Sequence, residues 1–192
     1  MDIRFLGHAC FELSDGDTRV LIDPFLTGNP KAAVEASELD PSAILLTHGH
    51  ADHLGDTVDI AKRVNCPVVA IVELANEIGG NGVEQVFDPN IGGTVKFDWG
   101  WVKLTPAWHT AVTPSGTPHT PAGLLIGIGG HYTMDRLDAV EAAKFIEAGT
   151  VVPCHYDTFP PIETDADAFK SEVESETSSK VQILQPGETH SL

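Results

Sequence analysis

The sequence predicts one domain, spanning residues 1–192, of the layered α/β (α+β) class. Three observations support this prediction. Short apolar stretches separated by turn residues dominate the first quarter, strand patterns then alternate with helical ones, and histidines follow directly after apolar stretches. The length suits a single hydrophobic core, and we find no internal repeat and no domain boundary.

The individual elements follow from local patterns. Apolar runs bounded by turn residues predict strands at 3–6, 10–13, 19–22, 43–46, 68–71, 94–97, 101–104, 123–128, 151–152 and 181–184. Apolar residues at helical spacing predict helices at 54–64, 73–78, 137–149 and 165–173. The first helix begins inside a polar motif, and Gly79-Gly80 ends the second. Because Pro24 disfavours the helical conformation of the preceding residue, we expect Asp23 at an extended strand end.

The composition narrows the classes of function. Asp and Glu number 28 against 11 Lys and Arg, which gives a formal charge of −17. Such a surface repels nucleic acid and anionic membranes, so we expect neither as a partner. The acidic excess fits a salt-adapted host and an acidic mesophilic protein equally well. No apolar stretch reaches the roughly 20 residues of a membrane span, and the N-terminus lacks a secretory pattern, so we expect a cytoplasmic protein.

The most informative stretch is 47–53, Thr-His-Gly-His-Ala-Asp-His, which directly follows the apolar run 43–46. Its imidazoles and carboxylate suit zinc, iron or manganese, and the residues that carry them are His48, His50, Asp52 and His53. Their spacing does not match one face of a helix, where neighbours lie three or four residues apart. It favours a loop at the end of a strand. The motif therefore predicts a metal site.

Further stretches match a known family pattern, and together they cover nearly the whole chain: 5–8, 21–30, 45–56, 106–109, 128–134 and 155–161. Two of the more specific are Gly-Gly-His-Tyr-Thr-Met at 129–134 and His-Tyr-Asp-Thr-Phe-Pro-Pro at 155–161. With the histidine motif, they resemble the metallo-β-lactamase superfamily. The closest resemblance is to its group of small metal-dependent hydrolases related to ascorbate-6-phosphate lactonase. The resemblance implies an αββα sandwich, with two mixed sheets face to face, helices outside and metals at one edge.

The resemblance also implies a set of metal ligands. The ligands of one divalent ion would be His48, His50 and His109, and those of a second would be Asp52, His53 and His155. Independently of the resemblance, His109 and His155 each follow an apolar segment, as ligands at strand ends do. We expect zinc first, with manganese or iron as alternatives.

The expected chemistry follows from such a site. Divalent ions lower the pKa of water and polarise a carbonyl or phosphoryl oxygen. The predicted activity is therefore hydrolysis of a small-molecule ester, lactone or phosphoester by a metal-activated water. Asp52 would orient this water and accept its proton, and His131 would hydrogen-bond the substrate or leaving group. His8 and Asp23 are expected behind the ligands, where an acceptor fixes an imidazole tautomer, although a structural role stays open for both and for His131.

One departure from the family pattern concerns the segment after Ile126. The pattern continues there through two strands and a helix, roughly thirty residues that include an aspartate bridging both metals. Here the segment Gly-Ile-Gly-Gly-His at 127–131 follows at once. Without the bridge the second ion should bind less tightly, leaving one ion or two, unless Asp135 or Asp157 compensates. The absent elements would also expose edges or apolar faces, so we expect a homo-oligomer.

Three alternative functions stay open. The missing bridging aspartate favours a metal-binding paralogue with weak or no catalysis. The acidic surface disfavours a nuclease of the same superfamily. An oxidoreductase using iron is a further option, but no flavin or nicotinamide glycine motif accompanies the histidines.

Overall fold

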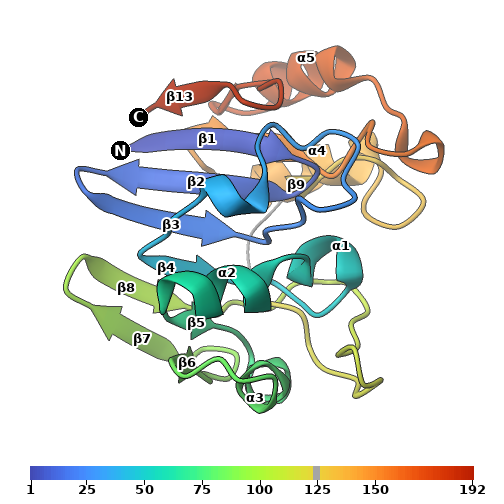
Figure 1. Ribbon diagram of the computed structural model, residues 1–192. Helices are drawn as coiled ribbons and strands as arrows, with labels where there is room; N and C mark the ends of the chain where they lie inside the picture. Colours follow the sequence, from blue (N-terminus) through green and yellow to red (C-terminus); the bar gives the residue numbers. More distant parts are fainter. Residues whose placement is uncertain (123–125) are drawn as a thin grey trace.

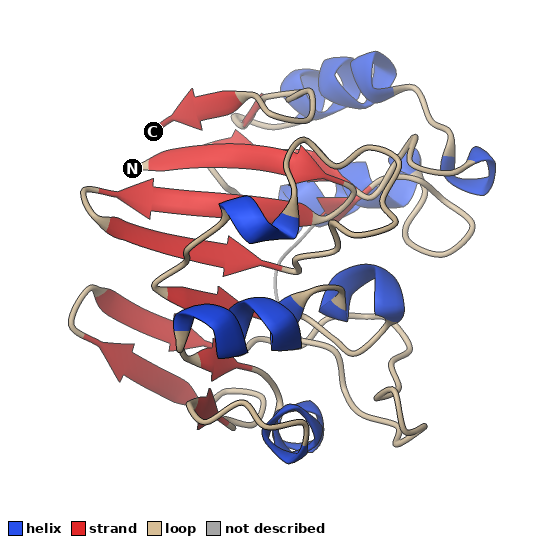
Figure 2. Cartoon of the chain, viewed as in Figure 1, coloured by secondary structure: helices blue, strands red, loops and turns tan. Residues whose placement is uncertain are grey.

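The computed structural model describes residues 1–122 and 126–192 and contains one large mixed sheet (Figures 1 and 2). Its seven strands lie in the order β13-β1-β2-β3-β4-β5-β6. β1 to β3 are joined as antiparallel hairpins, β3 to β6 pair in parallel, and β13 adds antiparallel to β1. The bounds are β1 (Asp2–Gly7), β2 (Cys10–Asp15), β3 (Thr18–Ile22), β4 (Ala43–Leu45), β5 (Val68–Val69), β6 (Val86–Phe87) and β13 (Thr189–Ser191).

A second, smaller layer consists of short parallel pairs. β9 pairs with β11 and β10 pairs with β12. Because only Val152 separates β10 from β11, the two pairs are successive parts of one layer. β7 and β8 form a separate antiparallel hairpin, and in the part of the chain that the structure describes neither strand pairs with a strand of the two layers. The bounds are β7 (Thr94–Phe97), β8 (Gly100–Lys103), β9 (Ile126–Gly127), β10 (Thr150–Val151), β11 (Pro153–Cys154) and β12 (Lys180–Val181).

Helices cover both outer faces. α2 packs against β4 and α3 against β6, whereas α4 and α5 pack against each other and against β9 and β12. Figure 1 shows α1 and α2 in front of the large sheet and α4 behind it. Among the described residues, no helix has both the length and the apolar character needed to cross a membrane. The bounds are α1 (Ala51–Leu54), α2 (Thr57–Val64), α3 (Val72–Gly80), α4 (Arg136–Ile146), α5 (Ala166–Glu176) and the 3₁₀ turns η1 (Ala36–Glu38) and η2 (Pro160–Ile162).

Three clusters of buried side chains fill the spaces between the layers. Along β1 and β2, Leu6 and Cys10 belong to the cluster under α2 and α3, whereas Phe5 and Phe11 belong to the inner cluster with Cys154. This alternation is the period of two that a strand imposes. A third cluster joins α4 and α5 to the second layer. The layers therefore run helix, sheet, sheet, helix, in agreement with the predicted layered α/β fold.

The structure corrects two helix predictions. The single helix expected from the motif to Val64 is two helices, α1 and α2, because Gly55 between them has a φ of +43°. The helix expected to end at Gly79-Gly80 includes both glycines as the last residues of α3, with Asn81 as its C-cap. A glycine lowers helix propensity by only about 1 kcal/mol, which tertiary packing of α3 readily offsets.

Several strand predictions also change. Asp23 is left-handed (φ +44°) instead of extended, since its N–H donates to the Leu45 carbonyl and its carboxylate turns toward Thr47. The sequence did not predict β6 or β13, and the strand expected at 181–184 is shortened to β12. The strand expected at 123–128 is present as β9, and residues 123–125 lie outside the described part of the chain. Within the described residues, the second layer consists of two short parallel pairs, β9–β11 and β10–β12.

Candidate metal centre

Four segments bring polar side chains to one edge of the large sheet. His8 occupies the turn between β1 and β2, and the 47–53 motif runs from the end of β4 into α1. His109 lies in the loop after β8, and His155 directly follows β11. This edge lies on the right in Figure 1, beside α1. Strand ends position His8, the 47–53 motif and His155, whereas His109 was expected at a strand end and instead lies in the loop after β8 (Gly100–Lys103).

The first group of potential ligands is formed by His48, His50 and His109, whose ligand atoms all lie within 4.8 Å of one another. His50 Nδ1 lies 3.1 Å from His48 Nε2 and 3.3 Å from His109 Nε2. Donor atoms that sit about 2.0–2.1 Å from a tetrahedral zinc ion are roughly 3.3 Å apart. The three imidazoles are therefore spaced as ligands of a common ion would be.

The second group contains Asp52, His53, His155 and also His8. Asp52 Oδ2 lies 3.1 Å from His8 Nε2 and 3.5 Å from His155 Nε2. The rings of His53 and His155 are stacked, with centroids 5.3 Å apart. Within the described residues, the Nδ1 atom of His155 is buried and has no hydrogen-bond partner. A carboxylate and imidazoles gathered in this way suit the same class of ions as the first group.

Asp23 connects the two groups from behind. Oδ2 of its fully buried carboxylate accepts a hydrogen bond from the Thr47 hydroxyl (2.5 Å) and also contacts His53 Nδ1 (2.8 Å). Because the Thr47 hydroxyl donates to Asp23, it accepts from His48 Nδ1, 2.9 Å away. This network assigns the protons to Nδ1 of His48 and His53 and leaves both Nε2 lone pairs for the site. One carboxylate therefore sets the tautomer of an imidazole in each group.

Burial favours the neutral form of four of these imidazoles. Desolvation lowers the pKa of His48 to about 2, and it also lowers the pKa of His8, His50 and His109. Burial alone would raise the pKa of the Asp52 carboxyl, but hydrogen bonds with His155 and His8 outweigh it and hold this pKa well below its usual range. Neutral imidazole and ionised carboxylate are the protonation states that bind metals.

The backbone at this edge is strained. His8 (φ +60°), Asp23 (φ +44°) and His155 (φ +57°) all occupy the left-handed region. Such conformations cost on the order of 1–3 kcal/mol each in a residue other than glycine and persist where the surroundings enforce them. Here the His155 N–H donates to the His8 carbonyl at 2.7 Å, so the two turns hold each other in place. Strain of this kind is concentrated at functional sites.

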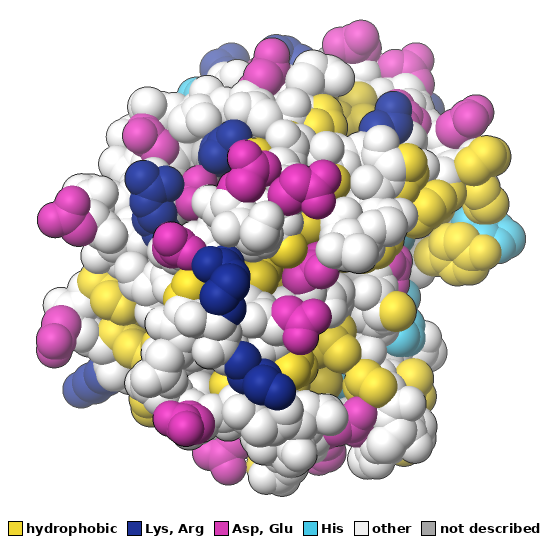
Figure 3. Space-filling view, viewed as in Figure 1, with side chains coloured by type: hydrophobic (Ala, Val, Ile, Leu, Met, Phe, Trp, Pro, Cys, Tyr) yellow, Lys and Arg dark blue, Asp and Glu magenta, His cyan; other side chains and the backbone are white. Residues whose placement is uncertain are grey.

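A cavity of about 570 Å³ opens beside both groups. His131 and Tyr132 form part of its wall, with their rings edge to face and centroids 4.5 Å apart. On the right-hand edge of Figure 3, histidine side chains reach the surface among hydrophobic ones, while acidic side chains are spread over the rest of this face. The complete lining consists of His50, Asp52, His109, Thr110, His131, Tyr132 and His155.

The structure brings the predicted site residues together. All six predicted ligands lie in the two groups, and His131 lines the adjoining cavity. Their roles as ligands and as a substrate contact stay predictions. His8 lies closer than expected, because it joins the second group instead of standing behind it.

His119 contacts the motif, although no pattern in the sequence assigned it a function. His119 Nε2 accepts a hydrogen bond from the Gly49 N–H at 3.2 Å. This places His119 against the loop that carries His48 and His50. Because 70 residues separate the two partners, no local pattern in the sequence could have indicated this contact.

The two carboxylates considered as substitutes for a bridging aspartate have other partners. Asp135 caps α4, accepting from the N–H groups of Leu137 and Asp138 at 2.9 Å each. Asp157 accepts from the Thr164 N–H at 2.9 Å. Neither belongs to the two ligand groups found among the described residues. Neither Asp135 nor Asp157 therefore replaces the bridging aspartate in this structure.

Comparison with known proteins places this site in a family. The sequence profile of the metallo-beta-lactamase superfamily matches residues 3–131. A UPF0173 metal-dependent hydrolase of Methanopyrus kandleri is 40% identical over 228 aligned positions, covering 99% of each chain. The chain belongs to the UPF0173 family of metal-dependent hydrolases. A UPF0173 protein of Pelotomaculum thermopropionicum is likewise 40% identical over the full length of both chains.

Among solved structures, the UPF0173 chain is similar to Igni18, a metallo hydrolase from the hyperthermophilic archaeon Ignicoccus hospitalis. The identity is 32%, the TM-score is 0.87, and the match covers 98% of this chain and 97% of the other. The UPF0173 protein is accordingly a metal-dependent hydrolase with the metallo-β-lactamase fold.

Proposed function

We propose that this UPF0173 hydrolase uses zinc, bound at one or two adjacent positions, to cleave a small ester, lactone or phosphoester. The observation that carries the proposal is the convergence of His109 with His48 and His50 of the motif, although 59 residues separate His109 from His50. When bound, zinc supplies a Lewis acid and makes a water molecule acidic enough to lose a proton near neutral pH. Manganese and iron are the other ions that this donor set accepts.

The chain's own residues then have distinct roles in the proposal. His48, His50 and His109 hold the first ion, and Asp52, His53 and His155 hold the second. Asp52 is partly exposed (36% of its side chain) and lines the cavity, so it can orient a water molecule and accept its proton. His8, which contacts Asp52 at 3.1 Å, keeps this carboxylate in place. His131 lines the same cavity and contacts the substrate or leaving group.

We also infer that the segment missing after Ile126 weakens the second position. The alignment with the Methanopyrus kandleri relative spans 228 positions, whereas this chain has 192 residues, so at least 36 positions have no counterpart here. This is close to the size of the segment that would carry a bridging aspartate. Fewer negative charges between two cations leave more of their repulsion uncompensated, so the second ion should dissociate first.

The test compares His50→Ala with His190→Ala, a matched control on β13 outside both ligand groups. Zinc content per chain and turnover of 4-nitrophenyl esters and phosphodiesters are measured for both variants and the parent. We expect His190→Ala to match the parent and His50→Ala to lose bound zinc and turnover together. Equal zinc content in His50→Ala and the parent would contradict the proposed site.

A second candidate function is metal binding with little catalysis, which the absence of at least 36 aligned positions favours. It predicts that the parent protein retains one equivalent of zinc through dialysis. It also predicts no turnover of any ester or phosphodiester above that of the zinc-free protein. Turnover that scales with zinc content would rule this candidate out.

A further inference from the structure

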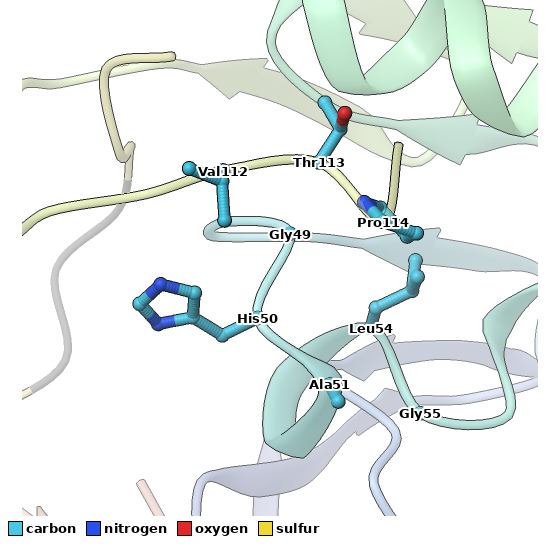
Figure 4. A pocket seen from close by; sticks show the side chains of 8 residues that line it. All are labelled: Gly49, His50, Ala51, Leu54, Gly55, Val112, Thr113 and Pro114. Atoms are coloured by element: carbon cyan, nitrogen blue, oxygen red, sulfur yellow. The ribbon is translucent and has the colours of Figure 1, made fainter. Parts of the chain in front are cut away.

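A second, apolar groove adjoins the proposed metal centre. It has a volume of about 340 Å³, and His50 lines both this groove and the larger cavity. Figure 4 shows the His50 ring at one end of the groove, while Leu54 and Pro114 face each other at the other end. A molecule held next to His50 in the cavity can therefore extend into the groove. The groove is lined by Gly49, His50, Ala51, Leu54, Gly55, Val112, Thr113 and Pro114.

The lining of both spaces carries little charge. The groove has no Asp, Glu, Lys or Arg among its described lining residues, and Asp52 is the single such residue lining the cavity. Apart from the metal ion itself, an anionic group on a substrate would find no Lys or Arg side chain to pair with in the described lining of either space, and the groove away from the metal offers an anion no charge at all. An apolar chain, by contrast, would bury its surface away from water by packing on Leu54, Val112 and Pro114, which favours its binding. This chemistry favours a neutral substrate with an apolar extension.

The wall of the groove that contains Val112, Thr113 and Pro114 is a hairpin turn, residues 112–118, and contacts with its surroundings hold this turn in place without a ligand. An antiparallel bridge joins Val112 to Pro118, and Glu77 of α3 accepts both the N–H (3.0 Å) and the hydroxyl (2.5 Å) of Ser115. A Cβ on Gly49 would lie 2.6 Å from the Val112 carbonyl, so hairpin and motif loop are in close contact. Because this turn is already ordered, a ligand that binds in the groove pays little entropy for ordering it.

We propose that this groove is an acyl-chain subsite and that the substrate is a neutral carboxylic ester or lactone with an unbranched alkyl chain. The inference rests on the hydrolase function proposed above. In the reaction, the oxygen of water bonds to the carbonyl carbon, and the bond from that carbon to the leaving oxygen breaks. The leaving oxygen keeps the electron pair and takes up one proton of the water. The acid formed releases the other proton at neutral pH.

The first test is a chain-length series. Turnover of 4-nitrophenyl acetate, butyrate, hexanoate and octanoate is measured with zinc-loaded protein, and the rate of zinc-free protein is subtracted. Each methylene buried in the groove should raise kcat/KM about fourfold until the groove is full. 4-Nitrophenyl phosphate and bis(4-nitrophenyl) phosphate should be the poorer substrates. A flat series, or faster cleavage of the phosphate compounds, overturns the inference and leaves the hydrolase function standing.

The second test fills the groove. Val112→Trp introduces a large side chain into its wall, and Leu192→Trp is the matched control at an exposed aliphatic residue outside the lining. We expect the octanoate-to-acetate ratio of kcat/KM to fall at least tenfold in Val112→Trp and to stay unchanged in Leu192→Trp. An unchanged ratio in a folded Val112→Trp overturns the subsite. If that variant does not fold, the chain-length series alone tests the subsite. If zinc-loaded parent protein cleaves none of these compounds, that result contradicts the hydrolase function itself.

Discussion

At the scale of single residues, Asp23 shows how one buried carboxylate can organise a whole site. It contacts His53 directly and His48 through the Thr47 hydroxyl, so both ligand groups depend on it. The sequence analysis placed Asp23 behind the ligands, and the structure shows it in contact with one of their imidazoles. The sequence could not show that Thr47 connects Asp23 to His48 of the other group, because the hydrogen bond between Thr47 and Asp23 joins residues 24 positions apart.

Asp23→Asn should therefore weaken zinc binding. An amide replaces one acceptor oxygen with a donor, which leaves His53 or Thr47 without its partner, and losses of this kind typically reduce metal affinity 10- to 100-fold. Competition with a chromogenic chelator measures the affinity, and Asp59→Asn on the exposed face of α2 is the control. The same zinc affinity in Asp23→Asn and Asp59→Asn would remove Asp23 from the account.

Residues of the site differ in how far the sequence could reveal them. His48, His50, Asp52 and His53 are visible because they fall within six positions, in a pattern that chance seldom produces. His109 and His155 needed the family resemblance, since a lone histidine after an apolar run has many uses. His119 gave no signal, and the position of His8 inside the second group is set by long-range packing.

At the scale of elements, the sequence predicted the strongly patterned segments and missed short strands such as β6 and β13. β1 to β3 and the helices α4 and α5 lie close to the expected positions, because their period and turn residues are local. β13 forms by pairing Thr189–Ser191 with the start of β1, and β6 has two residues, so both depend on tertiary contacts. The break between α1 and α2 also depends on such a contact, at Gly55.

Gly55 allows the motif loop to approach the segment that follows β3. A Cβ there would lie 2.3 Å from the Pro24 carbonyl oxygen and 2.5 Å from the Phe25 Cα, and the φ of +43° disfavours other residues. We expect Gly55→Ala to destabilise the zinc-free protein by at least about 2 kcal/mol, which lowers Tm by roughly 4–8 °C. Calorimetry measures this shift.

Gly80→Ala is the control for that experiment. Gly80 lies in α3, and a Cβ there meets no atom within 4 Å. Stability should stay the same or rise by up to about 1 kcal/mol, because alanine loses less backbone entropy on folding. If both substitutions shift Tm equally, the close approach at Gly55 is not what fixes the loop.

At the scale of the whole molecule, helix α4 leaves large apolar side chains uncovered. Leu137 and Phe145 of α4 are 59% and 82% exposed, and α4 packs against β9. We therefore expect a homodimer through α4. Because each chain carries a formal charge of −17, screening should tighten the dimer at high salt.

Light scattering at several salt concentrations measures this association, and Phe145→Glu should shift the protein toward the monomer. A folded parent protein that stays monomeric throughout the micromolar range, at low and high salt alike, would rule out the dimer. The proposed metal site would be unaffected by that result, since both ligand groups lie within one chain.

The central claim is that two groups of side chains hold divalent ions at one edge of the sheet, and that each group combines the 47–53 motif with histidines from distant parts of the sequence. Anomalous diffraction from zinc-loaded crystals tests it most directly. We predict a strong zinc peak bonded to His48, His50 and His109, and a weaker peak bonded to Asp52, His53 and His155. Zinc bound elsewhere, or no zinc peak among these residues, would contradict the account.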